Sequence, residues 1–118
     1  MNDPKRIAHL WFSAFNNHDL ESLLELYNED AQHYSPKLKM RQPSTNGLIT
    51  GKNALREWWA DAFKRHPQLN YELLQLTVEK NRVFMEYIRH TPGEEDLRVG
   101  ETLTIRNNKI VASRVYHS

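Results

Sequence analysis

Apolar residues recur at helical spacing in two short stretches at the start of the chain. The first stretch follows Asp3 and Pro4, a residue that caps helices and a ring that fits the first helical turn. Its apolar positions are Ile7, Leu10, Trp11, Ala14 and Phe15. The second stretch follows Asp19 and carries Leu20, Leu23, Leu24 and Tyr27. This spacing predicts a helix from Pro4 to about Asn16 and a second helix capped by Asp19.

The helical pattern returns once, and the chain then changes to an alternation of period two. Helical spacing links Leu55, Trp58, Trp59, Ala62 and Phe63, and Pro67 stops this third helix. From residue 70 onward, strand-like runs cover 71–79, 82–91, 97–106 and 109–117. Lys80-Asn81, the stretch TPGEED and Asn107-Asn108 separate these runs. The pattern predicts four strands in a meander.

The stretch DAQHYSPK at 30–37 alternates without an apolar face, since His33 and Ser35 share one side and Gln32 and Tyr34 the other. Such a strand lies at a sheet edge or lines a polar cavity. The segment 36–50, with two prolines and a Ser-Thr-Asn-Gly cluster, predicts a long loop, and long loops in compact domains often act as lids.

This order of elements predicts an α+β fold. Three helices from the N-terminal half of the chain cover one face of a curved, mostly antiparallel sheet. With 118 residues the chain is long enough for one core, and we expect a single domain over 1–118.

Composition narrows the function classes. Lys and Arg total 16 against 15 Asp and Glu, without a basic block, so nucleic acid is a poor candidate partner. No run is apolar and long enough to span a bilayer, and no cysteine is available for a disulfide, a thiolate metal site or a nucleophile. We expect a cytoplasmic protein.

The order of elements resembles the nuclear-transport-factor-2-like superfamily, within it the SnoaL-like and ketosteroid-isomerase-like branch. The resemblance includes AFNNHDLESLLELYNEDA, Pro36, GLITGKNALREWW and the terminal NNKIVASRVYHS, and it covers nearly the whole chain. It implies a cone-shaped α+β barrel, a site inside the cone between sheet and helices, and a homodimer formed through the sheet surface. The fold hosts enzymes and binding domains, so function depends on the site.

The resemblance also implies roles for three residues. A ketosteroid isomerase carries its general-base Asp before the Pro at the end of the first strand, and here Ser35 occupies that place. Its oxyanion-hole Tyr falls on Trp11, whose indole donates one hydrogen bond. Its second oxyanion donor, a carboxylic acid, falls on Glu101.

Glu101 is also a candidate without any resemblance. It interrupts an apolar row of Leu97, Val99, Leu103 and Ile105, and burial would raise its pKa into the range of a useful acid. A hairpin symmetric about Gly93 and Glu94 places Glu86 directly opposite Glu101. Alternatively, an arginine (Arg89, Arg106 or Arg114) neutralises one of these acids in a structural ion pair, or the hairpin has a different register.

His33 is the candidate base on the first strand, if its side faces the cavity. The last strand leaves two alternatives open. A tight two-residue turn at Asn107-Asn108, without a bulge, places Ala112, Arg114 and Tyr116 on the face of Glu101. One additional bulged residue places Ser113, Val115 and His117 there instead.

Together these residues predict a pocket for an apolar organic molecule with a carbonyl, hydroxyl or epoxide oxygen. Trp59 or its neighbour Trp58 would form part of the wall. We expect cofactor-free acid/base chemistry, such as isomerisation, dehydration or cyclisation, with Glu101 as acid or oxyanion donor and His33 as base. No close-spaced metal-ligand set occurs, so no metal is expected. A non-catalytic ligand-binding domain and a protein-interaction module are the alternatives.

Overall fold

The computed structural model describes residues 3–117. Its α-helices are α1 (Pro4–Asn16), α2 (Leu20–Glu25), α3 (Pro36–Arg41) and α4 (Lys52–Arg65), with a 3-10 turn, η1 (Pro43–Thr45). The side chain of Asp3 accepts a hydrogen bond from the Arg6 amide at the start of α1, and Asp19 does the same for Ser22 in α2. The helices predicted after Asp3 and Asp19 and the helix before Pro67 are confirmed. No described helix is long and apolar enough to cross a membrane.

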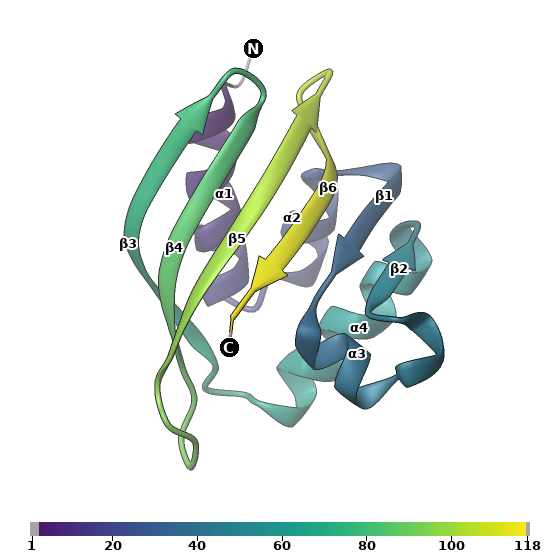
Figure 1. Ribbon diagram of the computed structural model, residues 1–118, viewed down its shortest axis with the longest axis vertical. Coiled ribbons are helices and arrows are strands. Elements are labelled where there is room, and N and C mark those ends of the chain that lie inside the picture. Colours follow the sequence, from purple (N-terminus) through teal and green to yellow (C-terminus); the bar gives the residue numbers. More distant parts are fainter. Residues whose placement is uncertain (1–2, 118) are drawn as a thin grey trace.

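Six strands form one sheet in the order β2-β1-β6-β5-β4-β3. They are β1 (Tyr27–Tyr34), β2 (Leu48–Thr50), β3 (Asn70–Glu79), β4 (Arg82–His90), β5 (Leu97–Arg106) and β6 (Lys109–Tyr116). Only the pair β1–β6 is parallel in the described sheet. The α+β class is confirmed, although the curved sheet stays open between β2 and β3 instead of closing into a barrel. Figure 1 shows α1 and α2 behind this sheet. It also shows α3 and α4 beside β2, which is one of the two edge strands.

The segment 36–50 is not the loop that its prolines predicted. It contains α3, η1 and β2, which brings the described α-helices to four instead of three. Ser35 caps α3 by accepting a hydrogen bond from the Lys37 amide, and Pro36 occupies the first turn. The same cap-and-proline signal starts α1, so the local chemistry explains the helix. As a consequence β1 ends at Tyr34, and it begins earlier than predicted, at Tyr27.

The predicted register of the β4–β5 hairpin is wrong by one residue. Met85 pairs with Glu101, and Glu86 pairs with Gly100. The hairpin is symmetric about Gly93 alone, and a shift of one residue moves every side chain of β4 to the other face. The inner row of β4 is therefore Val83, Met85, Tyr87 and Arg89, and Glu86 lies on the outer face.

The register of the last strand follows the bulged alternative. Asn107 and Asn108 form a two-residue turn with positive φ at both, and the pairing then shifts between Thr104 and Ile105. Glu101 consequently pairs with Val115, so Ser113, Val115 and His117 belong to its face. Arg114 lies on the opposite face. The concave face of the sheet and the helices enclose an apolar core that includes the fully buried Ile7, Trp11, Leu23, Tyr27, Met85 and Leu103.

Candidate functional site

A cavity of about 290 Å³ lies between the concave face of the sheet and the helices α1, α3 and α4. Six aromatic side chains contribute to its wall: Trp11, Phe15, Trp58, Trp59, Tyr71 and Tyr87. Glu101, His33, Ser35 and His117 also line it. The size suits a small ligand, near the lower end of the usual range for small-molecule pockets.

Glu101 is 1% exposed and lies among apolar neighbours on β5. The Tyr87 hydroxyl donates a hydrogen bond of 2.8 Å to its Oε1, whereas Oε2 is buried without a hydrogen-bond partner among residues 3–117. Burial raises the pKa of Glu101 to about 8, although the Tyr87 hydrogen bond alone would lower it. The carboxyl group is therefore mostly protonated at neutral pH, and it can donate a hydrogen bond or a proton.

Tyr87 positions this carboxyl group, and the sequence reasoning missed it. Its ring stacks on Tyr71 with 4.2 Å between centroids and meets Phe12 edge-on, which fixes its orientation. Burial, followed by the charge of Glu101, raises the pKa of Tyr87 well above its usual value, so the hydroxyl stays a donor. The alternation of Val83, Met85 and Tyr87 along β4 is the sequence signal that identifies Tyr87 as facing inward. The error of one residue in the predicted β4–β5 register concealed this signal.

His33 is 3% exposed, and it ends a chain of buried hydrogen bonds. The Trp11 indole donates to the Tyr27 hydroxyl (3.1 Å), and Tyr27 donates to Oγ of Ser113 (3.0 Å). Ser113 in turn lies 2.6 Å from Nδ1 of His33. When Ser113 donates to Nδ1, each hydroxyl in the chain both accepts and donates once, and the imidazole proton is on Nε2. Burial lowers the pKa of His33 to about 4, so the ring is neutral.

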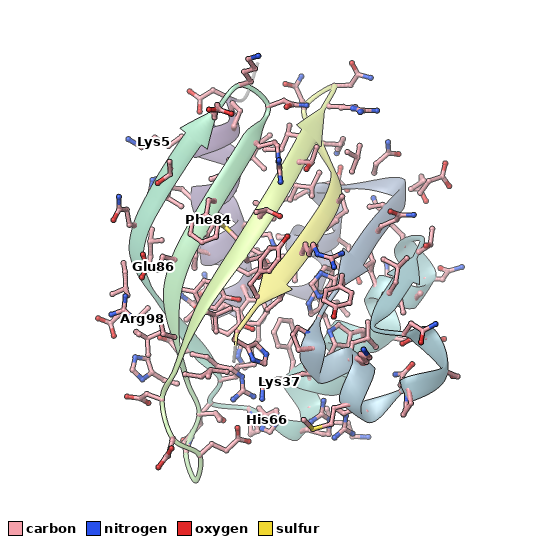
Figure 2. The ribbon with its side chains drawn as sticks, in the orientation of Figure 1. Lys5, Lys37, His66, Phe84, Glu86 and Arg98 are labelled. Atoms are coloured by element: carbon pink, nitrogen blue, oxygen red, sulfur yellow. The ribbon has the colours of Figure 1, made fainter. Side chains whose placement is uncertain are left out.

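Ionisable residues collect at one end of the same cavity, where Lys37, Arg41, Arg65, His66, Arg89 and Glu94 contribute to the lining. Arg89 donates a hydrogen bond of 2.8 Å to Glu94. Figure 2 labels Lys37 and His66 close together at this end of the molecule. The sequence predicts for Arg89 only the neutralisation of a glutamate, because the predicted hairpin register places the other row of β4 inside.

The comparisons with known proteins agree with this architecture. The sequence model of the SnoaL-like domain matches residues 8–113. The chain belongs to the SnoaL-like domain family. No match was found among curated proteins.

Several solved structures share the fold of this SnoaL-like domain. A SnoaL-like protein of unknown function from Burkholderia thailandensis superposes with a TM-score of 0.86 at 19% identity, over 98% of this chain and 94% of that one. A candidate polyketide cyclase from Sinorhizobium meliloti gives 0.79 at 20% identity, over 93% of each chain. A candidate ketosteroid isomerase from Kribbella flavida gives 0.79 at 16% identity, over 98% of this chain and 77% of that one. At such identities the likeness concerns the fold.

Trp11 and Ser35 do not provide isomerase-like groups in this SnoaL-like domain. The Trp11 indole N–H is already used on Tyr27, so the ring lines the cavity without offering a donor to it. The Ser35 side chain caps α3. Trp59 lies beside His33, with 5.3 Å between ring centroids, and both rings line the cavity.

Two predicted pocket residues, Glu86 and Arg114, lie outside the cavity lining. Glu86 forms an ion pair with Arg98 on the outer face of the sheet, where Figure 2 labels both. Arg114 stacks over the Tyr34 ring at 4.0 Å. Both corrections follow from strand register, the first from the β4–β5 hairpin and the second from the bulge beside β6. Among residues 3–117, no cluster of three His, Cys, Asp or Glu side chains is arranged to hold a metal ion.

Proposed function

We propose that this SnoaL-like domain binds a small apolar molecule carrying a carbonyl, hydroxyl or epoxide oxygen and promotes its cofactor-free acid/base rearrangement. Isomerisation, dehydration and cyclisation are reactions of this kind. The observation that supports the proposal is the buried Glu101 carboxyl group at the wall of the cavity. Its Oε2 has no partner among the described residues, and its pKa of about 8 keeps the proton available.

Glu101 acts as the proton donor to the ligand oxygen in this proposal. Oε2 is the donating atom, and Tyr87 stabilises the carboxylate that remains through its hydrogen bond to Oε1. Because Tyr87 is buried and stacks on the partly buried Tyr71, the donor is already held in place before the ligand binds. This arrangement lowers the cost of reorganisation during the reaction.

His33 faces the same cavity from the far side of β6. It pairs with Ser113 on β6, whereas Glu101 pairs with Val115. The two Cα atoms are therefore about 10 Å apart across two strand spacings and about 7 Å apart along the strands. A ligand must bridge the two side chains. The hydrogen-bond chain from Trp11 favours Nε2–H, which makes His33 a second donor to the ligand. The base role remains for the other tautomer, in which Nε2 accepts a proton.

Exchange of α-protons for deuterium tests the proposal without a known substrate. A thermal-shift screen of cyclic and aromatic ketones identifies compounds that stabilise the wild type. NMR in deuterated buffer then follows exchange at the carbon next to the carbonyl. We expect exchange faster than in buffer alone, and a loss of about a hundredfold or more in Glu101→Gln, as for general acids. Glu86→Gln is the matched control on the outer face and should retain the wild-type rate.

Non-catalytic ligand binding is the second candidate, and the residue before Pro36 favours it. A ketosteroid isomerase carries a carboxylate base at this place, whereas this chain carries Ser35, whose side chain caps α3. Ketones that stabilise the protein but show no accelerated exchange would support this candidate over catalysis. The open cavity argues against an interaction module whose interior is filled by side chains.

We also propose a homodimer through the outer face of the sheet. Phe84 and Tyr116 are 41% and 47% exposed there, on either side of the strand that carries Gly100. In a two-fold dimer each surface residue occurs twice, so Phe84→Glu introduces two charges into the interface. Light scattering after gel filtration should give a dimer mass for the wild type and a monomer mass for this variant. A monomeric wild type would refute the proposal.

A further inference from the structure

Arg89 is a buried cation, and its ion pair with Glu94 uses only part of its hydrogen-bonding capacity. The residue is 6% exposed at the end of the inner row of β4, and it lines the cavity. A guanidinium group has five N–H donors. One bond, from Nη1 to Glu94 Oε1 at 2.8 Å, is the only hydrogen bond that its guanidinium makes to residues 3–117. The remaining donors are available to a molecule in the cavity.

The surroundings of Arg89 add further positive charge. Burial and the charge of Arg89 lower the pKa of Lys37, on the first turn of α3, while Glu94 opposes this shift. Arg65 and Arg41 share one carboxylate, Asp61, at 2.7 and 3.9 Å. The cavity lining therefore includes four cationic side chains and, at this end, the carboxylate of Glu94, whereas Asp61 pairs with two of the cations from outside the lining.

We infer that Arg89 and Lys37 form the binding site for a carboxylate group of the ligand. The Arg89 nitrogens that make no hydrogen bond to the described residues are not fully buried, and the residue lines the cavity, so a ligand can reach them. A carboxylate can accept two parallel N–H bonds from one guanidinium. Lys37, on α3, lines the same cavity and supplies a second charge that interacts with Arg89. A structural role for Arg89, limited to holding the hairpin tip through Glu94, would leave these donors without a function.

The position of this anion site relative to Glu101 defines the shape of the ligand, and this step rests on the proposed function. Arg89 pairs with Leu97, and Glu101 follows four residues later on β5, about 13 Å along the strand. Tyr71, Leu69 and Val99 line the cavity as well. The ligand class is a flat, apolar carboxylic acid with a carbonyl or hydroxyl oxygen at its opposite end.

Two fluorescent probes with the same hydroxynaphthalene ring system test the inference. The first is 6-hydroxy-2-naphthoic acid, and the second is 2-naphthol, which lacks the carboxylate. Titration at neutral pH should show that the wild type binds the acid at least about tenfold more tightly, as expected for charged hydrogen bonds. Arg89→Gln should remove this preference while retaining the affinity for 2-naphthol. Lys37→Gln, at a less buried position, should reduce it by a smaller factor. Arg98→Gln removes a guanidinium from the outer face and should change neither affinity.

The outcomes separate this inference from the proposed function. Equal affinities of the wild type for both probes would overturn the carboxylate site and leave the apolar oxygen pocket intact. Binding of neither probe would overturn both. If the preference depends on Arg89 but Glu101→Leu, which cannot donate a hydrogen bond, leaves both affinities unchanged, the carboxylate site stands and Glu101 loses its role as a donor to the ligand. If Arg89→Gln fails to fold, an unchanged preference in Lys37→Gln together with equal salt sensitivity of the two probes would refute the inference.

Discussion

The two faces of the β4–β5 hairpin each carry one glutamate, and the two carboxyl groups meet different surroundings. Glu101 points inward, is 1% exposed and receives one hydrogen bond from Tyr87. Glu86, on the neighbouring strand, points outward and pairs with Arg98. Burial without a counter-ion keeps the first group protonated, whereas the second is a surface ion pair. The direction of a side chain from the sheet therefore decides which of two similar residues can perform acid chemistry.

The largest expected effect is on the pH dependence of stability, through Glu101. An unfolded glutamate titrates near pH 4.5, and the folded-state pKa is about 8. Between these values the folded state keeps a proton that the unfolded chain has lost. The free energy of unfolding should therefore fall as pH rises, by about 5 kcal/mol in total. Urea denaturation should show that Glu101→Gln lacks this fall and overtakes the wild type in alkaline buffer.

Glu86→Gln is the control for this measurement. It removes a carboxyl group from the same strand pair and retains Glu101, so the alkaline fall is expected to remain. If Glu101→Gln and the wild type keep the same difference in stability across the range, Glu101 is ionised in the folded state and the acid role fails.

A second, smaller effect of opposite sign is expected from His33. The folded-state pKa of about 4 lies below the usual 6.5, so the unfolded chain binds a proton that the folded state excludes. Stability should decrease by about 3 kcal/mol as pH falls through this window. Since the slopes from His33 and Glu101 oppose each other between about pH 4.5 and 6.5, the His33 slope should be clearest in the Glu101→Gln background.

The measurement is urea denaturation of Glu101→Gln with and without His33→Asn. The added substitution should remove the acid-side fall, whereas His9→Asn, on the exposed side of α1, should leave it in place. A fall of equal size in both double variants would show that another group causes it.

The sequence predicted the helices and strands well where one period holds over a long run. The apolar rows of α1, α4 and β5 each follow a single period, so their buried faces could be read directly. The inward direction of Glu101 followed in this way. The helix α3 was missed because it is six residues long, too short for periodicity to outweigh its proline.

The candidate site was harder to predict, because it depends on register. An error of one residue in the predicted 91–96 turn placed Glu86 on the inner face of β4 instead of Tyr87. The same error placed Arg89 on the outer face. The bulge beside β6 decided between Arg114 and His117 in the same way. The geometry of a turn or bulge depends on a few backbone angles. The alternation of side chains along a strand does not report these angles, so it does not fix the register between strands.

A third prediction concerns contact on the outer face. A Cβ atom added at Gly100 would lie 2.6 Å from Cζ of Phe84, whose ring covers the glycine. The ring is 41% exposed and can move aside, so Gly100→Ala should cost about 1 kcal/mol. In a Phe84→Ala background this cost should vanish, which a double-mutant cycle of unfolding free energies measures. Additive effects of the two substitutions would mean that the ring does not pack on Gly100.

The smallest effect is expected for the ion pair between Glu86 and Arg98. Both side chains contact solvent, with the arginine 68% exposed, so water screens their attraction. A double-mutant cycle with Glu86→Gln and Arg98→Gln should give a coupling energy of at most about 1 kcal/mol, decreasing as salt is added. Coupling of about 2 kcal/mol or more, insensitive to salt, would show that the pair is shielded from water in solution. The outer face would then be covered, as in the proposed dimer, and the contrast between the two glutamates would lie in their partners instead of their exposure.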